Sequence, residues 1–507
     1  MIIRGTPGSI SFCSLLIILA IASAIFPPIS LAESEPKNAA PTQSYNIQAG
    51  YLYDALMQFS QQAGIKLAIN PDILQGKVTP GLVGNFEIKA GLDQLLAGSG
   101  LQLVQRAEGF AITEAPPASN EQVTTLPSIQ VTATTTTRYS AVSSATATKT
   151  NTLLRDVPQS ITVITDELIK DQSVRSIGDA VRYVPGVGVS QGEGNRDALV
   201  FRGNRSTGDF FTDGIRDDVE YYRDLYNIER VEVLKGANGM IFGRGGSGGV
   251  VNRVTKQANW DPVREFMFQG GSYNQKRMTA DVGHAINDVA AIRLNAMYED
   301  AGSFRNGVTM ERWGISPTIT LKPTHRTKVI ANVERFHDDR TADRGITSVM
   351  GNVGEVTGPV DVRRSQFFGD PRRSNANAEV LFLNSFIEHK FDSGVTLQNR
   401  TNFALYDKFY QNVFANGGLR LATDEVSLGA YNNTTDRENV FNQTNLIYSL
   451  NTGPLTHTLL AGIEVGRQET HNQRQTGLFN NNPANTSLLV SFSNPITNVP
   501  ITFRTRD

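Results

Sequence analysis

The order of apolar and polar residues divides the chain into segments with different periodicities. A nearly unbroken apolar run comes first, within residues 10–26. Residues 45–113 then carry apolar positions at the i, i+3, i+4, i+7 spacing of a buried helix face. These positions are Leu52, Ala55, Leu56 and Phe59. From residue 263 onward the period falls to two, which indicates strands with one apolar and one polar face.

The alternating region 263–507 predicts a large β structure. Its apolar positions include Ile292, Leu294, Ala296 and Tyr298, then Leu397, Phe403 and Leu405, then Leu459, Ala461, Ile463 and Val465. A membrane β-barrel, with lipid outside and water inside, has this alternation, and so does a soluble β-sandwich. We count roughly ten candidate strands. Polar insertions at 338–376 and 411–437 are expected to form long loops.

The first 32 residues have the features of a secretory signal. Arg4 supplies the positive charge, residues 15–22 are an unbroken apolar run, and Ser30-Leu31-Ala32 places small residues at a cleavage site. We therefore expect a signal peptide at 1–32 and export from the cytoplasm, with a short membrane anchor as the alternative. The single cysteine, Cys13, lies in this segment, so no disulfide is expected after cleavage.

Residues 45–113 are expected to form a small α+β domain of two helix–strand units. The motif Ile-Gln-Ala-Gly at 47–50 is echoed by Ile-Lys-Ala-Gly at 88–91, where the helical spacing starts again. Together with residues 95–101 (Leu-Leu-Ala-Gly-Ser-Gly-Leu), the first motif resembles the secretin/TonB short N-terminal domain. This resemblance implies a periplasmic signalling domain, a module that secretins also contain.

Residues 114–150 are expected to form a flexible linker. Thr fills 10 of the 27 positions from 124 to 150, a composition that buries too little apolar surface to offset chain entropy. Inside the linker a short alternating run resembles a TonB box, the contact for the energy-transducing protein TonB. Its residues are Ser128, Ile129, Gln130, Val131, Thr132 and Ala133. Such a segment could pair with the edge of a partner's sheet, or it could be plain linker.

Residues 151–257 contain several short motifs in a fixed order. Thr165 and Ser176 are expected helix N-caps, the second with Asp179 in a capping-box arrangement. Residues 243–248 match G-x-G-x-x-G, the shape of a dinucleotide-binding loop. That interpretation requires a following helix, whereas residues 250–255 have a strand pattern, so we do not favour it.

The motifs of this segment closely resemble the plug domain of TonB-dependent siderophore receptors, most of all the catecholate and ferrichrome type. The motifs are Asp-Val-Pro-Gln-Ser at 156–160, Val-Pro-Gly-Val at 184–187, Phe-Arg-Gly at 201–203, Asp-Gly-Ile-Arg-Asp at 213–217, Tyr-Asn-Ile-Glu-Arg-Val-Glu-Val-Leu-Lys-Gly at 226–236 and Gly-Arg-Gly at 243–245. The resemblance implies a mainly β protein: a small α+β signalling domain, an α+β plug at 151–257, and part of a transmembrane antiparallel β-barrel at 263–507.

The length of the last region does not fit a whole barrel of this family. Such a barrel has about 22 strands, and each strand needs about 9–11 residues besides its loops. Residues 257–507 supply about ten of these strands, so a C-terminally truncated barrel is expected.

Composition argues against other function classes. The 47 basic and 49 acidic residues nearly balance, which gives no argument for nucleic-acid binding. The six histidines are scattered without metal-ligand spacing. We therefore expect no enzyme, no catalytic residues, no resident metal and no cofactor, with iron present only within a bound ferric siderophore.

The resemblance also implies the ligand-binding residues, which should lie at the outward tips of the plug. Tyrosine offers a flat apolar face and arginine offers charge-assisted hydrogen bonds to an anionic chelate. The expected residues are Gln191, Glu193, Asn195, Arg196, Arg216, Tyr221, Tyr222 and Arg223. Four other charged residues are expected to form ion pairs between plug and barrel: Arg202, Glu229, Arg230 and Glu232.

The function implied by the resemblance is ferric-siderophore reception and transport at the outer membrane of a Gram-negative bacterium. The implied partners are the ferric siderophore, TonB, outer-membrane lipid and an inner-membrane anti-sigma regulator, to which the periplasmic N-terminal domain would report occupancy. The alternatives are a truncated sensor or remnant that does not transport, and a receptor for another large ligand such as haem or cobalamin.

Overall fold

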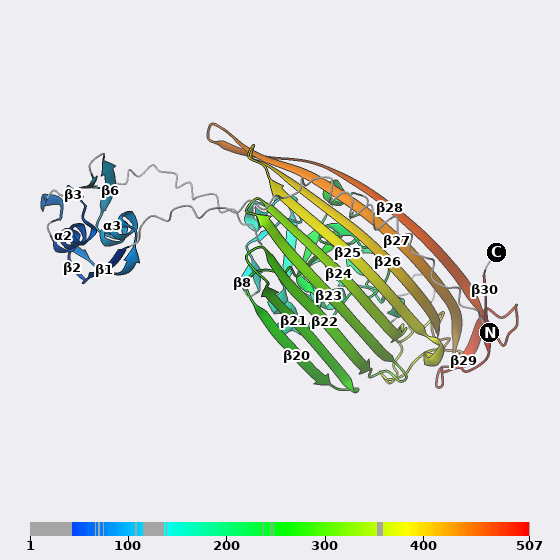
Figure 1. Cartoon of the computed structure of the whole chain (residues 1–507). Helices are drawn as coiled ribbons and strands as arrows, with labels where there is room; N and C mark the ends of the chain where they lie inside the picture. Colours follow the sequence, from blue (N-terminus) through cyan, green and yellow to red (C-terminus); the bar gives the residue numbers. More distant parts are fainter. Residues whose placement is uncertain are drawn as a thin grey trace. The chain divides into compact units, whose positions relative to one another are not determined.

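The computed structural model describes residues 43–505 except 66, 69–70, 75, 107–108, 115–135, 138, 237, 244, 247 and 352–357. The chain forms two compact units, residues 1–129 and 130–507 (Figure 1). Each unit is described by itself. The expected signal peptide at 1–32 and the TonB-box segment at 128–133 lie outside the described residues.

The first unit is a small α+β domain. Its elements are β1 (Gln43–Ile47), β2 (Gly50–Tyr51), α2 (Leu52–Ala63), β3 (Leu67–Ala68), η1 (Pro71–Leu74), β4 (Val78–Thr79), β5 (Leu82–Phe86), α3 (Ile88–Leu96), β6 (Leu101–Arg106) and β7 (Gly109–Glu114). β1 pairs with β5, β2 pairs with β4, and β7 lies between β3 and β6. The two expected helix–strand units are thus α2 with β3 and α3 with β6.

The core of this unit is the helix face predicted from the sequence. Leu52, Ala55, Leu56 and Phe59 of α2 are all buried. The Phe59 ring stacks on Tyr45 of β1 with 4.4 Å between centroids. Gly64 ends α2 in the left-handed conformation, with φ 66°, where glycine is favoured because it has no Cβ.

The second unit begins with short elements that lead into a five-stranded sheet. They are β8 (Thr136–Thr137), β9 (Ser140–Ala141), β10 (Ser143–Ser144), β11 (Thr152–Leu153), η2 (Leu154–Asp156), β12 (Ser160–Thr165), α4 (Asp166–Asp171), α5 (Ile177–Val181), β13 (Val187–Val189), η3 (Gly192–Gly194), β14 (Leu199–Phe201), β15 (Asn204–Ser206), β16 (Phe210–Thr212), β17 (Ile215–Arg216), β18 (Ile228–Lys235), α6 (Gly239–Phe242) and β19 (Gly249–Thr255). The sheet order is β12-β18-β19-β16-β17.

Several local predictions for this region are confirmed. The Thr165 and Ser176 side chains cap α4 and α5 by accepting hydrogen bonds from the backbone N–H groups of Leu168 and Asp179. The glycine-rich segment leads into β19, a strand rather than a helix, which removes the dinucleotide-loop interpretation.

The prediction of a flexible linker at 114–150 is wrong for the last part of that segment. Residues 139–150, here called the strap, lie against the plug sheet. Ser144 donates a 2.9 Å hydrogen bond to Glu232, and Asn252 donates one of 2.9 Å to Thr146. Ala147 is buried in an apolar cluster with Phe211 and Leu234. The composition indicated flexibility because Ser, Thr and Ala side chains are not strongly apolar. Small Ser and Thr side chains can nevertheless hydrogen-bond to a buried polar surface, and Ala can pack beside them.

The rest of the chain forms an antiparallel sheet of eleven strands. Its elements are β20 (Val263–Gly271), β21 (Gln275–Ala285), β22 (Ala290–Gly302), β23 (Thr309–Thr324), β24 (Thr327–Thr341), η4 (Pro371–Arg373), β25 (Asn375–Lys390), β26 (Val395–Ala415), β27 (Glu425–Thr452), β28 (Leu455–Phe479), β29 (Ser487–Ser491) and β30 (Ile501–Thr505). Strands β20 to β28 follow one another in chain order and are long (Figure 1).

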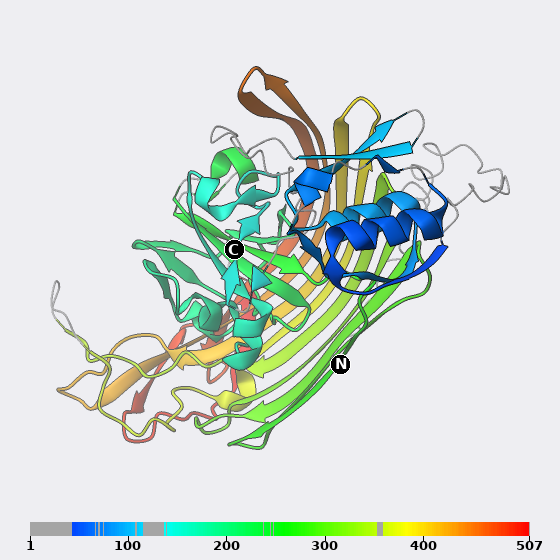
Figure 2. The ribbon, with the colours of Figure 1, turned by 90° about the vertical axis from the view of Figure 1, so that its left-hand side faces the viewer.

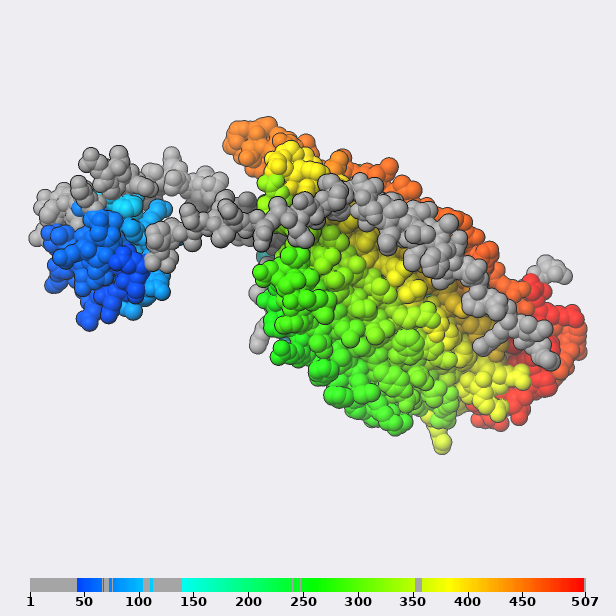
Figure 3. All heavy atoms as spheres, viewed as in Figure 1, coloured from blue at the N-terminus to red at the C-terminus, as the bar shows by residue number. Residues whose placement is uncertain are grey.

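This sheet curves around the plug region, with its convex face outward (Figures 2 and 3). The predicted alternation is confirmed in β22. Ile292 and Leu294 expose 45% and 40% of their surface, whereas Asn295 and Glu299 expose 1% and 0%. Apolar side chains therefore cover the convex face and polar side chains face the plug. Among the described residues, no helix has the length and apolarity needed to cross a membrane.

One loop prediction is confirmed in part and the other is largely wrong. Residues 342–374 separate β24 from β25, close to the expected 338–376. In the second segment only 416–424 separates β26 from β27, so most of 411–437 is strand. The polar run at 432–435 is paired on both sides, with β26 and with β28. Polar residues on both faces of these strands removed the alternation that would have indicated a strand.

The strap predicts a measurable effect of Ser144. Substitution Ser144→Ala removes a hydrogen bond to a buried carboxylate, so we expect a loss of about 1–3 kcal/mol of stability. Hydrogen exchange of the strap amides should rise in this variant. Ser140→Ala, at an exposed strap position, is the matched control and should change neither quantity. Equal exchange in both variants would contradict the packing described here.

Candidate functional site

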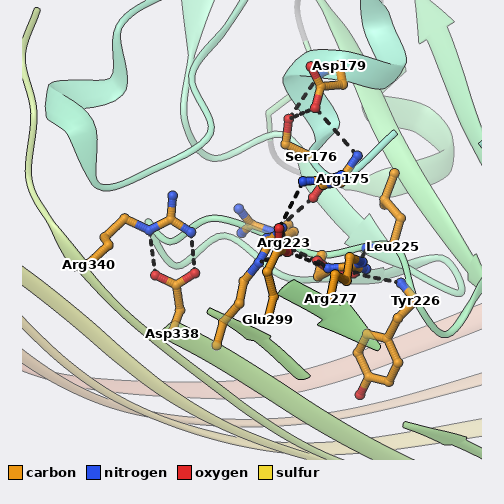
Figure 4. Close-up of polar contacts among 12 residues, drawn as sticks. Arg175, Ser176, Asp179, Arg223, Leu225, Tyr226, Arg277, Glu299, Asp338 and Arg340 are labelled. Carbon is orange, nitrogen blue, oxygen red and sulfur yellow. Dashed lines mark hydrogen bonds and ion pairs between the residues drawn. The ribbon is translucent and has the colours of Figure 1, made fainter. Parts of the chain in front are cut away.

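A buried network of charges joins the plug to three strands of the sheet. Asp224 accepts hydrogen bonds of 2.9 and 2.8 Å from the two terminal nitrogens of Arg277 on β21, and it lies 3.0 Å from Arg312 on β23. Glu299 on β22 contacts the same two arginines at 2.7 Å each. Arg175 of the plug pairs with Glu299 at 3.0 Å (Figure 4). We call these five residues the Asp224 network.

The Asp224 carboxylate also shapes the chain beside it. It accepts hydrogen bonds from the backbone N–H groups of Leu225 and Tyr226 at 2.8 and 2.9 Å. Burial alone would raise the pKa of Asp224, but Arg277 and Arg312 hold the pKa well below its usual value. The carboxylate therefore stays ionised. Tyr226 lies against Gly314 of β23, where an added Cβ would come within 2.7 Å of the ring.

A second buried network centres on Asp217. Its carboxylate accepts hydrogen bonds of 2.8 Å from Arg223 and from Arg253, and one of 3.0 Å from Tyr221. The hydroxyl of Tyr406, on β26 of the sheet, also donates a 3.0 Å hydrogen bond to the Asp217 carboxylate. Burial raises the pKa of Asp217, but the two arginines outweigh that effect and the pKa is lowered. This network ties the plug to β26, a strand that does not take part in the Asp224 network.

The plug also reaches the sheet through a short loop, Gly192–Gly194. All three residues have positive φ, and Glu193 is the one that is not glycine, with φ 54° and ψ 21°. Gly194 lies against the backbone of Asp343, because an added Cβ would be 2.4 Å from the Asp343 carbonyl oxygen. Only glycine allows this approach. We call residues 191–196 the apex loop.

Cationic and aromatic side chains from the sheet and from the loop after β24 gather around the apex loop. We call them the apex cluster: Arg344, Tyr410, Phe414, Tyr431 and Arg474. The Arg344 guanidinium lies 3.6 Å from the centre of the Phe414 ring, and Arg474 lies 3.8 Å from that of Tyr431. Arg344 also donates hydrogen bonds of 3.0 and 2.9 Å to the hydroxyls of Tyr410 and Tyr431. Cation–π and hydrogen-bond contacts thus hold the arginines in place.

Of the expected ligand residues, Glu193 contacts this cluster and Arg196 pairs with Glu193. Gln191 lies in the same loop and is exposed. The Glu193 carboxylate accepts a hydrogen bond from Tyr431 and pairs with Arg344 at 3.3 Å. Arg196 pairs with Glu193 at 3.1 Å. Tyr222 lies apart from this group, under the Arg340 guanidinium, 4.2 Å from the centre of its ring. Burial raises the pKa of Tyr222 to about 12, so its hydroxyl is neutral at physiological pH.

The other four expected residues are buried and do not belong to the apex cluster, although Asn195 is part of the apex loop. Asn195 is 5% exposed, and Tyr221 and Arg223 are 3% and 0% exposed as members of the Asp217 network. Arg216 donates to the Gly208 carbonyl and lies over the Phe211 ring, beside the glycine-rich segment. Their residue types suited an anionic ligand, but a buried arginine needs buried acceptors, and here the plug supplies them.

The expected plug–barrel ion pairs also need correction. Arg230 pairs with Glu232 at 2.5 Å within the same strand, and Glu232 accepts from the strap. Arg202 is exposed. The ion pairs that cross from plug to sheet include Lys170 with Glu265 at 2.7 Å and Lys256 with Asp281 at 2.9 Å, besides the Asp224 network. Alternate residues of a strand share one face, which favours the Arg230–Glu232 contact.

Sequence patterns did not identify the apex cluster, because its members come from one loop and three strands. Arg344 lies 66 and 87 residues from Tyr410 and Tyr431. Their proximity depends on strand register, which no local pattern reveals. The arginines of the cluster can bind an anion, and its aromatic rings can pack against flat apolar faces of that anion. Within the described residues, no group of three His, Cys, Asp or Glu side chains is placed to hold a metal ion.

Family models identify the two N-terminal modules. The TonB-dependent Receptor Plug Domain matches residues 153–250, and the Secretin and TonB N terminus short domain matches residues 65–112. With the curved antiparallel sheet that follows, this is the domain order of a TonB-dependent receptor. The chain thus contains the plug domain and the short N-terminal domain that TonB-dependent receptors carry.

Two curated relatives and one solved structure show the likeness. The catecholate siderophore receptor Fiu of Escherichia coli K12 is 30% identical over 342 residues, covering 62% of this chain and 44% of Fiu. The probable TonB-dependent siderophore receptor PiuA of Acinetobacter baumannii is 29% identical over 329 residues, with the same coverage of 62% and 44%. The ferripyoverdine receptor of Pseudomonas aeruginosa, bound to ferripyoverdine, superimposes with a TM-score of 0.63 at 21% identity, covering 88% of this chain and 58% of that one.

The chain thus spans somewhat less than half the length of the curated relatives it matches. The eleven-stranded sheet is part of a TonB-dependent receptor barrel. The expected localisation is confirmed: the Gram-negative outer membrane, with the N-terminal domain in the periplasm.

The Asp224 network predicts a large loss of stability on neutralisation. Asp224→Asn leaves two buried arginines short of a counter-charge, so we expect about 3–5 kcal/mol of destabilisation. Thermal unfolding in detergent, followed by circular dichroism, measures it. Asp261→Asn, at an exposed position, is the control. An unchanged unfolding temperature for Asp224→Asn would show that the network does not hold the plug.

Asp197 predicts a pH dependence of stability. It accepts a 3.0 Å hydrogen bond from the Arg223 backbone N–H, yet burial raises its pKa to about 6 despite Arg223. Since the folded pKa lies above the unfolded value of about 3.9, the neutral form stabilises the fold at low pH. Stability from this group should fall as pH rises from about 4 through about 6. In Asp197→Asn, the midpoint of chemical denaturation should depend less on pH across that window. An equal slope in both proteins would contradict the assignment.

Proposed function

We propose that this protein binds a ferric siderophore on its extracellular side and imports it with energy supplied through TonB. The observation that carries the proposal is the apex cluster, in which arginine and aromatic side chains of the barrel meet the tip of a plug domain. The family supports transport rather than chemistry, and relatives with siderophore receptor in their names support the class of cargo.

The chemistry of the cluster favours an anionic, aromatic chelate. Ferric catecholates carry negative charge and flat rings. The guanidinium groups of Arg344 and Arg474 provide charge-assisted hydrogen bonds, and Tyr431 and Phe414 provide ring faces. The relative Fiu is named a catecholate siderophore receptor, which agrees with this preference. We propose that residues 191, 193 and 196 of the apex loop sense the chelate.

Energy would enter through the segment 128–133. An extended peptide can add a strand to a partner's sheet edge, with backbone hydrogen bonds supplying the affinity. We propose that TonB takes this segment as its partner. The strap begins at residue 139, a few residues further along the chain, and contacts the plug sheet, so a pull on 128–133 would reach the plug through it.

The N-terminal domain supports a second role in signalling. Its compact core and match to the secretin and TonB short domain favour a periplasmic contact module. We propose that it reports occupancy to an anti-sigma regulator at the inner membrane. A protein that signals without transport has the same domains, and a measurement of uptake separates the two.

Binding and uptake of a labelled ferric catecholate by cells that produce the protein test the proposal. We expect tight, saturable binding and TonB-dependent uptake. Val131→Pro should abolish uptake and preserve binding, because proline removes a backbone donor from a pairing strand. Ser119→Pro, outside that segment, is the matched control and should transport normally. Binding without uptake by the unaltered protein would favour the sensor, and no binding of any ferric chelate would refute both.

A further inference from the structure

The anion site of the apex cluster is already occupied by a side chain of the plug. One carboxylate oxygen of Glu193, Oε2, accepts a hydrogen bond from Tyr431 and lies 3.1 Å from Arg196 and 3.3 Å from Arg344. Burial opposes ionisation, but these contacts outweigh it and lower the pKa of Glu193. A carboxylate of the protein thus sits where an anionic chelate would find its cations.

The backbone at Glu193 indicates that the side chain is held there against local preference. Its φ of 54° lies in the left-handed region, between two glycines that adopt the same region without strain. A third glycine would suit this loop better by itself. The contacts of the carboxylate and the 3.1 Å hydrogen bond from Tyr410 to the Glu193 carbonyl offset that strain.

The site is accessible to a competing anion. The Glu193 side chain is 30% exposed, and those of Arg344 and Arg196 are 18% and 11% exposed. Arg474 adds a further cation, which lies over the Tyr431 ring at 3.8 Å from its centre. A chelate with several negative charges can contact more than one of these cations at once, which a single carboxylate does not match.

We propose that Glu193 is a built-in competitor, which an incoming multiply charged ferric chelate must displace from Arg344 and Tyr431. This inference rests on the proposed function and deepens it, because it makes Glu193 a specificity-determining residue rather than a ligand contact. Weakly charged chelates fail to displace the carboxylate. Successful displacement breaks the contacts of the Glu193 carboxylate with Tyr431 of β27 and with Arg344, so occupancy loosens the apex loop on that side.

The test compares affinities of the intact receptor for two probes, a trianionic ferric tris-catecholate and a neutral ferric trihydroxamate. Glu193→Gln removes the competing charge, so the catecholate Kd should fall by about tenfold, as expected when a competing state is no longer populated. Glu193→Gly, which also relieves the backbone strain, should give the same direction. Neither variant should tighten binding of the neutral probe.

Two variants serve as controls. Glu220→Gln removes a carboxylate that pairs with Arg196 at 3.4 Å and is not part of the apex cluster, so it should change the Kd by less than about twofold. Arg344→Gln should weaken catecholate binding by at least about tenfold.

The outcomes separate the two proposals. Weaker or unchanged catecholate binding in both Glu193 variants, with Arg344→Gln weakened, would overturn the competitor role and leave siderophore reception intact. Failure of the unaltered receptor to bind either chelate would remove the proposed function and this inference with it. Tighter binding of the neutral probe as well would show that loop strain, not charge competition, limits affinity, and would also overturn the proposal.

Discussion

The burial of charge between plug and sheet is the constraint on which the rest of the structure depends. A carboxylate or guanidinium taken out of water is costly unless an opposite charge and hydrogen bonds meet it. Asp217 and Asp224 are both almost fully buried, and each is satisfied by groups from the plug and the sheet together. The plug therefore fits this sheet in one position, because a shift of register would leave several charges without partners.

The same constraint explains what the sequence could predict. The spacing of apolar residues along the sequence predicted α2, the alternation of β22 and the apolar face of the sheet, because each depends on residues only a few positions apart. Motif order identified the plug, and short-range side-chain chemistry identified the caps at Thr165 and Ser176. The strap was missed because its small polar residues are buried by hydrogen bonds rather than by apolarity.

The candidate site was predictable only on the plug side. Glu193 and Arg196 were expected at the tip and lie there, but Arg223 proved to be an internal counter-ion. Residue type alone does not separate an arginine that awaits a ligand from one that neutralises a buried aspartate. The barrel side joins Arg344, from the loop after β24, to Tyr431 on β27. The spacing of these residues along the chain does not reveal that they meet.

The strap has a mechanical consequence. Its contacts succeed one another along the chain, from Tyr139 with Asp171 at 2.5 Å, to Ser144 with Glu232 at 2.9 Å, to Thr146 with Asn252 at 2.9 Å and the buried Ala147. Tension applied from the N-terminal side would load these contacts one after another and not all at once. The force needed to detach the strap is therefore modest. The five-stranded sheet beneath would bear load only after the last of these contacts has parted.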